Sequence, residues 1–321
     1  MALRGTLYVA GHTGLVGSAC MRRFAGREEL RLVTATRAQL DLRDASAVEQ
    51  FLQRERPDAV VMACGRVGGI WANATYPADF IRDNLQMELA LIDGAWKAGV
   101  ARLIHFGSAC MYPKECVQPM RPESLMTGRV EPTSEPYALA KLAGWSLCAS
   151  YNRQHGTTFT TLIPSTLYGP GDNFDPDRSH VISGLIRKFD EAARRGHAPV
   201  TLWGTGRARR EFLYVDDLAA ACEAVLEQPF VEGPINVGSS ESIAIHDLAA
   251  VIAEATGYRG AIEWDASRAE GPLLKELDSS AIRAMGWAPR TRLSDGLART
   301  VAWFREHDTA SIRKESLCAS S

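Results

Sequence analysis

The chain has 321 residues, and its 36 Lys and Arg against 38 Asp and Glu leave a formal net charge of −2. A net charge this close to zero argues against binding to nucleic acid or to an anionic membrane surface through overall positive charge. Hydrophobic residues make up 46% of the chain, which is enough for a full globular core, yet no apolar run approaches the ~20 residues that a transmembrane helix needs.

Short apolar runs alternate with longer amphipathic runs along the first half of the chain. The short runs predict strands at residues 6–10, 31–36, 59–64, 102–107 and 158–164, and the longer runs predict helices at 15–27, 45–56, 78–98 and 137–155. This alternation predicts an α/β fold with a Rossmann-type, doubly wound parallel sheet that helices cover on both faces. Strands in such a sheet are buried on both sides, which accounts for the uniformly apolar run at 59–64.

The pattern becomes irregular after residue 165. It predicts a helix at 181–196, a strand at 200–204, two segments at 212–229 and 234–238 that return to the first sheet, and further helices with one strand between 242 and 307. We therefore expect a smaller, discontinuous C-terminal α/β domain. Residues 1–166 and 206–238 form the first domain in this prediction, and residues 167–205 and 239–307 form the second. Residues 308–321 are polar and aperiodic, and an irregular tail is expected there.

A glycine-rich loop, Gly11-His12-Thr13-Gly14-Leu15-Val16-Gly17, joins the first predicted strand to the first predicted helix. Gly11 permits a tight turn, Gly14 lets backbone N–H groups approach a pyrophosphate, and Gly17 allows close packing of the helix. The N-terminus of the helix adds partial positive charge for the anion. A glycine triplet alone is a weak signal, but at a strand-to-helix junction it predicts a dinucleotide site.

The end of the second predicted strand bears on the choice between NADP and NAD. An acidic residue there would hydrogen-bond a ribose 2′-hydroxyl and repel a 2′-phosphate, whereas this chain has Thr36-Arg37, and Arg37 can pair with a 2′-phosphate. We therefore expect NADP(H) as the cofactor, with an ordinary solvated arginine as the alternative interpretation. Asp41 and Leu42 are expected to lie beside the adenine.

Tyr137 and Lys141 are four residues apart on a predicted helix, so both side chains project from one face. An unperturbed tyrosine, with a pKa of ~10, is a poor acid–base group near neutral pH, and a nearby ammonium lowers that pKa towards the working range. Ser108 ends the fourth predicted strand at the carboxyl edge of the sheet, where open α/β folds bind ligands. A lone Tyr-x-x-x-Lys is usually helix surface, but after a glycine loop and a strand-end serine it indicates a catalytic group.

The chain resembles the extended short-chain dehydrogenase/reductase family, and within it the GDP-L-fucose synthases. The resemblance lies in the order of the glycine loop, Ser108, Tyr137 and Lys141. Matching stretches lie at residues 66–70, 75–80, 107–114, 135–141, 167–174, 179–182 and 210–217, and the likeness continues to about residue 305. The resemblance implies an NADPH-dependent epimerase/reductase that acts on a nucleotide-linked 4-keto sugar. The expected substrate is GDP-4-keto-6-deoxy-D-mannose, which undergoes 3,5-epimerisation and then reduction at C4.

The same resemblance implies roles for individual residues. Cys110 and His180 exchange protons in the epimerisation, Ser108 and Tyr137 hydrogen-bond the developing enolate oxygen, and Tyr137 donates the proton when NADPH delivers hydride to C4. Lys141 tunes Tyr137 and holds the nicotinamide ribose. Further cofactor contacts are implied for Pro164, Leu167 and His180, and nucleotide-sugar contacts are implied for Lys188, Trp203, Arg210 and Glu270.

The nucleotide-sugar end departs from the family pattern. Lys188 stands where the family has an arginine, and lysine lacks the bidentate guanidinium fork. Leu274, which follows Pro272 and Leu273, also replaces an arginine. One interpretation is the same substrate with divergent contacts, and another is a paralogue that acts on a different nucleotide-linked 4-keto sugar, such as a 4-keto heptose.

Two other functions fit the fold less well. A nucleotide-sugar 4-epimerase that recycles tightly bound NAD would need no Cys110–His180 pair. A non-catalytic NADP sensor on the same fold typically lacks the tyrosine or the lysine, and both are present here.

The remaining composition bears on location and partners. The seven cysteines are scattered without a CxxC motif and the chain does not start like a signal peptide, so we expect reduced thiols and a cytoplasmic location. The seven histidines show no HxH or HxxxH pair, so no metal site is expected. The resemblance implies a homodimer formed through the helices at 78–98 and 137–155. Their apolar side chains, which either build that interface or face the sheet, are Met87, Leu89, Leu91, Ile92, Trp145, Leu147 and Tyr151.

Overall fold

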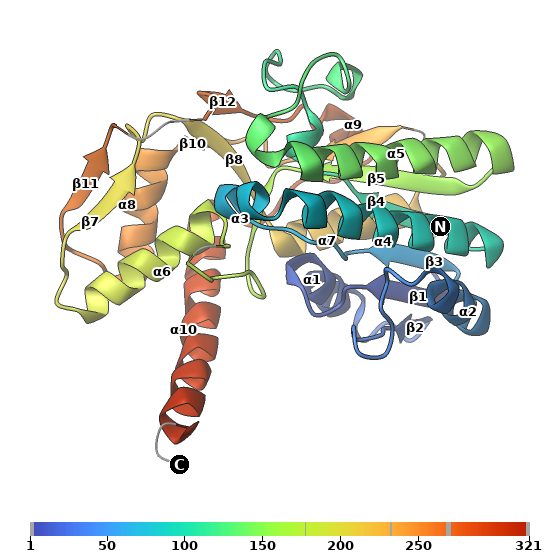
Figure 1. Ribbon diagram of the computed structural model, residues 1–321, viewed down its shortest axis with the longest axis horizontal. Helices are drawn as coiled ribbons and strands as arrows, with labels where there is room; N and C mark the ends of the chain where they lie inside the picture. The colour runs from blue at the N-terminus through green and yellow to red at the C-terminus, as the bar shows by residue number, and fades with distance from the viewer. Residues whose placement is uncertain (1–2, 177, 232, 268–270, 319–321) are drawn as a thin grey trace.

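The computed structural model describes residues 3–176, 178–231, 233–267 and 271–318. Its larger part is a six-stranded parallel sheet with the strand order β2-β1-β3-β4-β5-β9 (Figure 1). The strands are β1 (Gly5–Ala10), β2 (Leu30–Val33), β3 (Ala59–Met62), β4 (Arg102–Phe106), β5 (Thr158–Pro164) and β9 (Pro234–Val237). The predicted doubly wound sheet is confirmed, because the chain runs outward from β1 in both directions.

Helices cover both faces of this sheet (Figure 1). The helices α1 (Leu15–Phe24) and α7 (Val215–Glu227) pack together on one face, and α2 (Ala45–Glu55), α4 (Pro77–Lys97) and α5 (Glu135–His155) pack side by side on the other. Side chains alternate along β1 accordingly. Leu7 and Val9 belong to the core beneath α1 and α7, whereas Tyr8 and Ala10 belong to the core beneath α2 and α4. Both faces of the strands are therefore apolar.

Most boundaries in the first half agree with the prediction to within a few residues. The predicted strand 31–36 already ends at Val33, because Thr36 begins a turn in which its N–H donates to Oε1 of Gln39 over 2.8 Å. The predicted helix 15–27 ends at Phe24, ahead of Gly26 with φ of 77°. The periodicity did not predict the shortest elements, which are α3 (Ile70–Thr75) and the 3₁₀ turns η1 (Ala109–Met111), η2 (Pro122–Ser124) and η3 (Pro132–Ser134).

The remaining strands form two small sheets, which together with α6, α8 and α10 make up the small lobe. In one sheet β8 (Arg209–Tyr214) pairs with β6 (Thr166–Tyr168), β10 (Ser242–Ala244) and β12 (Leu274–Lys275). In the other, β7 (Val200–Trp203) pairs with β11 (Ile262–Asp265). The later helices are α6 (Val181–Arg194), α8 (Ile245–Thr256), α9 (Ser280–Ala284) and α10 (Leu293–Cys318). The small lobe has a core of its own, which contains Phe189, Leu248 and Phe304.

Three expectations for the second half need correction. The segment 234–238 does join the large sheet as β9, but Phe212–Tyr214 belongs to β8 in the small lobe, so only α7 of the segment 212–229 covers the large sheet. The described residues between 242 and 307 contain three strands rather than one, since strands this short carry no visible alternation. Residues 308–318 continue α10 instead of forming a tail, because no Gly or Pro follows Gly296 in the helix and Asp308 pairs with Arg187 (3.5 Å) and Arg194 (3.3 Å).

Within the part of the chain that the structure describes, no helix has the length and hydropathy needed to cross a bilayer.

Candidate active site

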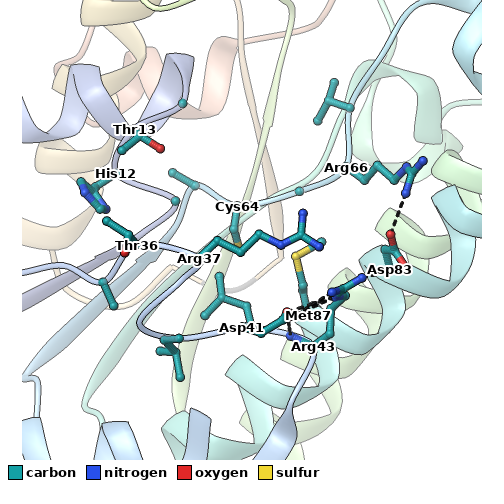
Figure 2. Close-up of a pocket in the computed structure, with 18 of the residues that line it drawn as sticks. His12, Thr13, Thr36, Arg37, Asp41, Arg43, Cys64, Arg66, Asp83 and Met87 are labelled. Carbon is teal, nitrogen blue, oxygen red and sulfur yellow. Dashed lines mark hydrogen bonds and ion pairs between the residues drawn. The ribbon is translucent and has the colours of Figure 1, made fainter. Parts of the chain in front are cut away.

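A cavity of about 590 Å³ opens at the carboxyl ends of β1, β2 and β3 (Figure 2). Its walls come from the loops that follow these strands, from α4, and from Arg178 in the segment before α6. Ligands of open parallel sheets bind where the crossovers leave in opposite directions, and that point lies here between β1 and β3. Of the predicted cofactor residues, the cavity brings together Gly11, His12, Thr13, Gly14, Arg37, Asp41 and Leu42.

The glycine loop has the backbone geometry that the sequence predicts. Gly11 has φ of 82°, and a Cβ there would lie 2.6 Å from the carbonyl oxygen of Ala63. A Cβ on Gly17 would collide with the carbonyl oxygen of Gly11, so only glycine lets α1 pack this close to the turn. Gly14 caps α1 without a side-chain hydrogen bond, which leaves the N–H groups of the first helical turn open to an anion. The predicted tight turn and close helix packing are confirmed.

The side chains of His12, Leu15 and Val16 in the same loop differ in their surroundings. The Nδ1 atom of His12 is buried and has no hydrogen-bond partner among the described residues. Leu15 and Val16 pack against the core under α1 rather than against the cavity. Their contribution to a cofactor site is therefore limited to their backbone N–H groups, because their side chains face the sheet.

Two arginines follow β2 on the cavity wall. Arg37 is exposed, and Figure 2 shows its side chain extending into the cavity. Asp41 is bound by Arg43 through a 2.6 Å contact between Nη2 and Oδ2, and this hydrogen bonding lowers the pKa of Asp41 to about 2. The sequence analysis missed Arg43, because an Asp-x-Arg pair looks like ordinary polar surface. Arg43 offsets the charge of a carboxylate that would otherwise repel a phosphate.

The loop after β3 adds another arginine to the cavity wall, Arg66, which the sequence did not predict as a site residue. Arg66 pairs with Asp83 of α4 over 2.9 Å and lies 5.8 Å from the ring centre of Tyr76. Asn84 binds the backbone N–H of Arg66 (2.8 Å) and its carbonyl (3.0 Å). With Arg178, also unpredicted, the cavity lining carries guanidinium groups from several loops. That charge fits a ligand with more than one phosphate.

Ser108 lies just beyond β4, at the carboxyl edge of the sheet. Its Oγ accepts a hydrogen bond from the N–H of Cys110 (3.2 Å) in η1, and it lies close enough to Tyr137 to lower the pKa of the phenol. The predicted neighbourhood of Ser108 and Tyr137 is therefore present. Cys110 lies close enough to Tyr137 to influence its charge.

Tyr137 and Lys141 lie on one face of α5, with Nζ of Lys141 5.9 Å from the ring centre of Tyr137. Burial raises the pKa of Tyr137, while the Lys141 ammonium and the hydrogen bond with Ser108 lower it, and the net direction is upward. The predicted net decrease is wrong, because burial outweighs the ammonium. The phenol is held neutral, which is the form that can donate a proton.

His180 begins α6, shortly after the cavity residue Arg178. Near it lies Asp172, whose Oδ2 accepts a hydrogen bond from Ser183; burial raises the pKa of Asp172, and Ser183 and His180 oppose that rise. The sequence analysis did not identify this carboxylate. Among the described residues no hydrogen bond joins His180 to Cys110, and neither residue lines the cavity.

The candidate substrate residues lie in the small lobe. Lys188 is exposed on α6, Trp203 is 68% exposed at the end of β7, and Arg210 of β8 donates to the carbonyl of Pro272 over 2.6 Å. None of the three lines the cavity, and Glu270 lies outside the described residues. Two predicted cofactor residues, Pro164 and Leu167, also fall outside the cavity lining. Across the described ranges, no group of three or more His, Cys, Asp or Glu side chains is placed to hold a metal ion.

Comparison with known proteins gives a consistent result. The sequence model of the NAD dependent epimerase/dehydratase family matches residues 7–238. The GDP-L-fucose synthase of Escherichia coli (strain K12) is 45% identical over 311 residues, covering 94% of this chain and 97% of that protein. An NADP-bound GDP-L-fucose synthetase from Naegleria fowleri superposes with a TM-score of 0.90 at 29% identity, covering 96% of both chains. A GDP-6-OMe-4-keto-L-xylo-heptose reductase from C. jejuni superposes with a TM-score of 0.87 at 30% identity, covering 96% of this chain and 99% of that one.

Proposed function

The chain belongs to the NAD dependent epimerase/dehydratase family, and on that premise we propose that it is an NADPH-dependent epimerase/reductase of a nucleotide-linked 4-keto sugar. The proposed substrate is GDP-4-keto-6-deoxy-D-mannose, which epimerisation at C3 and C5 and reduction at C4 convert to GDP-L-fucose. The observation that carries the proposal is the placement of Ser108, Tyr137 and Lys141 at the sheet edge that also holds the cavity. The relatives with GDP-L-fucose synthase activity in their names support the choice of sugar.

The residues of the cavity fit NADP(H). The open N-terminus of α1 faces the place of a pyrophosphate, and the unpartnered Nδ1 of His12 provides a further polar atom in the same loop. Arg37 and Arg43 supply positive charge for a 2′-phosphate, with Asp41 and Leu42 beside the adenine. NADPH, when bound, supplies the hydride for the reduction at C4.

The reduction requires a proton for the sugar oxygen at C4. Tyr137 is neutral and lies close to Ser108, so Ser108 can hold the carbonyl oxygen while the phenol donates its proton. The phenolate that forms is stabilised by the nearby ammonium of Lys141, whose Nζ lies 5.9 Å from the ring centre. These groups are in place before the reaction, so the protein need not reorganise around the new charge.

The epimerisations require an acid and a base, because the ketone at C4 acidifies the hydrogens at C3 and C5. Cys110 on η1 and His180, which caps the N-terminus of α6, are the acid and base in this proposal, one for each face of the sugar. Asp172 lies near His180, and burial raises the pKa of Asp172. Ser108 and Tyr137 stabilise the enolate oxygen in the same position that they use during reduction.

A second candidate substrate is a nucleotide-linked 4-keto heptose. The observations that favour it are Lys188 in place of a family arginine and the 68% exposed Leu273 next to Leu274, because these positions weaken guanidinium contacts on the small lobe. The heptose reductase among the structural neighbours supports it as well. The variant Lys188→Arg tests it: tighter binding of GDP-4-keto-6-deoxymannose supports the fucose substrate, and unchanged or weaker binding favours the heptose.

The two halves of the chain divide these tasks in our proposal. Residues 1–166 and 206–238 carry most of the cofactor site, and residues 167–205 and 239–307 carry most of the sugar site. The exceptions are β8 with Arg210, which belongs to the small lobe, and Arg178, which lines the cavity. The six cysteines whose side chains the structure describes are free thiols, which supports a reducing, cytoplasmic location.

We also infer a homodimer. Leu89 of α4 and Leu139 of α5 are 53% and 46% exposed on neighbouring helices, whereas Leu91 and Ile92 are buried against the sheet. Sedimentation of the wild type and of Leu89→Glu tests this inference: a dimer that dissociates in the variant supports it, and a wild-type monomer contradicts it.

The decisive assay measures NADPH oxidation with GDP-4-keto-6-deoxymannose in heavy water and identifies the product by NMR. Turnover with deuterium at C3 and C5 is the expected result. Tight NADPH binding without turnover would overturn the fucose assignment, and turnover without deuterium would show that the enzyme reduces but does not epimerise.

A further inference from the structure

Glu88 of α4 is a buried carboxylate beside the proposed catalytic groups. Its side chain is 3% exposed and forms an ion pair with Lys141, with 2.9 Å between Oε1 and Nζ. The Nε2 atom of the fully buried His105 lies 3.3 Å from the same oxygen. Removing two charges from water is costly, and only good geometry with further hydrogen bonds offsets that cost. A buried pair in this position therefore calls for an explanation beyond stability.

Three elements hold this carboxylate in place. His105 of β4 contacts Glu88 through Nε2 and Oγ1 of Thr161 on β5 through Nδ1 (3.2 Å). On α5, one turn beyond Lys141, Gly144 leaves the space that Glu88 occupies: a Cβ there would collide with the carboxylate and lie 2.6 Å from Nε2 of His105. The close approach of α4 to α5 at this level is what brings Glu88 to Lys141.

The ammonium of Lys141 lies between this carboxylate and the reacting groups. A Cβ on Gly65, which lines the cavity, would be 4.0 Å from Nζ. On another side Nζ lies 5.9 Å from the ring centre of Tyr137. Glu88 thus anchors one side of a buried ammonium that lies between Gly65 of the cavity wall and the phenol.

Glu88 and Lys141 each stabilise the charged form of the other. Burial alone would lower the pKa of Lys141, but Glu88, then Tyr137 and Cys64, raise it, and the net direction is upward. Burial alone would raise the pKa of Glu88, but Lys141 and His105 lower it. The pair is therefore ionised.

The neighbouring titratable groups are neutral. Burial lowers the pKa of His105, and it raises the pKa of Cys64 to about 11 and that of Cys148 to about 12. Glu88 is thus the only described acidic side chain near Lys141 that is charged at neutral pH. A neutral His105 can donate one N–H to Glu88 and accept the hydroxyl of Thr161 on its other nitrogen.

We propose that Glu88 is a positioning residue for catalysis: it keeps Lys141 charged and fixed beside Tyr137. The proposal rests on the function proposed above, in which Tyr137 donates the proton for reduction. Without the carboxylate, the desolvated lysine releases its proton and the phenolate of Tyr137 loses the charge that stabilises it. His105 and Gly144 serve the same arrangement by orienting Glu88 and making room for it.

The first test measures the ionisation of Lys141 without any substrate. The chain has six lysines, so labelling lysine with ¹³C at Cε gives few NMR signals, and Lys141→Arg identifies the one from Lys141. The expected result is that Glu88→Gln lowers the pKa of Lys141 by at least about two units, since burial is no longer offset. An unchanged Lys141 titration in a folded Glu88→Gln protein would overturn the proposal.

A matched control separates this effect from the general loss of a buried ion pair. Asp190 is 1% exposed and pairs with Arg194 and Arg305 over 2.7 Å each, in the small lobe. Asp190→Asn is expected to lower thermal stability but to leave the Lys141 signal unmoved. A shift of that signal in the control as large as in Glu88→Gln would also contradict a specific role for Glu88.

The second test follows the pH dependence of the reduction. In Glu88→Gln the alkaline limb of the kcat profile is expected to move to lower pH, with kcat at pH 8 reduced about 100-fold. Glu88→Asp keeps the charge, restores part of the activity, and serves as the folded alternative if Glu88→Gln does not fold. A limb that stays in place while only the melting temperature falls would show a purely structural role.

These outcomes separate the two proposals. A shifted Lys141 titration in a protein that does not turn over the sugar would contradict the proposed function and leave the role of Glu88 intact. An active wild type with an unshifted Lys141 titration in Glu88→Gln would support the proposed function and contradict the role of Glu88.

Discussion

The ammonium of Lys141 lies 5.9 Å from the centre of the Tyr137 ring, and both residues lie on the same face of α5. The positive charge of the ammonium lowers the pKa of the phenol, although burial outweighs that effect. It can therefore stabilise a phenolate without taking the proton that Tyr137 must deliver. The predictions below start from this arrangement and from the groups around it.

Tyr137→Phe removes the proton donor and leaves the rest of α5 unchanged. We expect the reduction at C4 to slow by about 10³-fold, the middle of the usual range for a general acid. NADPH binding, followed by cofactor fluorescence, should change little because the ring still fills the same space. Substantial turnover by Tyr137→Phe would mean that another group protonates the sugar oxygen.

Cys110→Ser separates epimerisation from reduction. A serine hydroxyl is a much weaker base than a thiolate, so deuterium uptake at C3 and C5 should fall more than NADPH oxidation, and the unepimerised 4-reduced sugar should appear among the products. His180→Gln should also impair deuterium uptake, since glutamine lacks a group that can exchange a proton. If Cys110→Ser leaves deuterium uptake intact, NMR of the product will show that the assigned role is wrong.

Arg37→Ala tests the choice of cofactor. Loss of a charge-assisted contact to the 2′-phosphate should raise the KM for NADPH by about 10- to 100-fold and leave the KM for NADH nearly unchanged. Arg54→Ala is a suitable control, because Arg54 is an exposed arginine of α2 that does not line the cavity. Equal effects on both cofactors would place Arg37 away from the 2′-phosphate.

Gly144→Ala places a methyl group against Glu88 and His105, neither of which is free to move. We expect a loss of about 1–3 kcal/mol in the free energy of unfolding, measured in urea, together with weaker NADPH binding. Gly94→Ala on α4 is the matched control, since its nearest contact is the flexible end of Leu52 at 3.1 Å. Similar losses in the two variants would count against a special constraint at Gly144.

Glu211 makes stability depend on pH. Burial raises the pKa of this carboxyl to about 7, although the N–H groups of Leu277 and Ser240 oppose the rise. The ordinary value is about 4.3, so between that pH and pH 7 the unfolded chain releases a proton that the folded protein keeps. The free energy of unfolding should therefore fall by about 3 kcal/mol as the pH rises from 4 to 8, with the loss levelling off above pH 7.

Glu211→Gln removes this titration. Urea unfolding at several pH values should give a nearly flat profile between pH 5 and 8 for the variant and a sloping one for the wild type. Parallel profiles would assign the pH dependence to other groups.

The sequence was sufficient for the large sheet and for the local parts of the site. Period-two and helical patterns are local, so the strands from β1 to β5 and the longer helices between them could be predicted within a few residues. Gly11 and Gly17 could be assigned because a strand-to-helix turn restricts backbone conformation within a few positions. Tyr137 and Lys141 share a face because one helical turn places them there.

The tertiary structure decided everything that depends on packing between distant elements. Arg178 reaches the cofactor cavity only because the segment before α6 folds back over the large sheet, and β8 joins the small lobe because its partners there include β10 and β12. Burial likewise reversed the expected shift of Tyr137, since desolvation is a property of the packed state.

Glu88 shows the difference most clearly. In the sequence it is one acidic residue of an amphipathic helix, and nothing nearby identifies it. It becomes the partner of Lys141 only where α4 packs against α5 at Gly144. Local sequence determines which side chains share a face of one helix, but the strength of an ion pair depends on distance and burial, and the fold alone sets both of these.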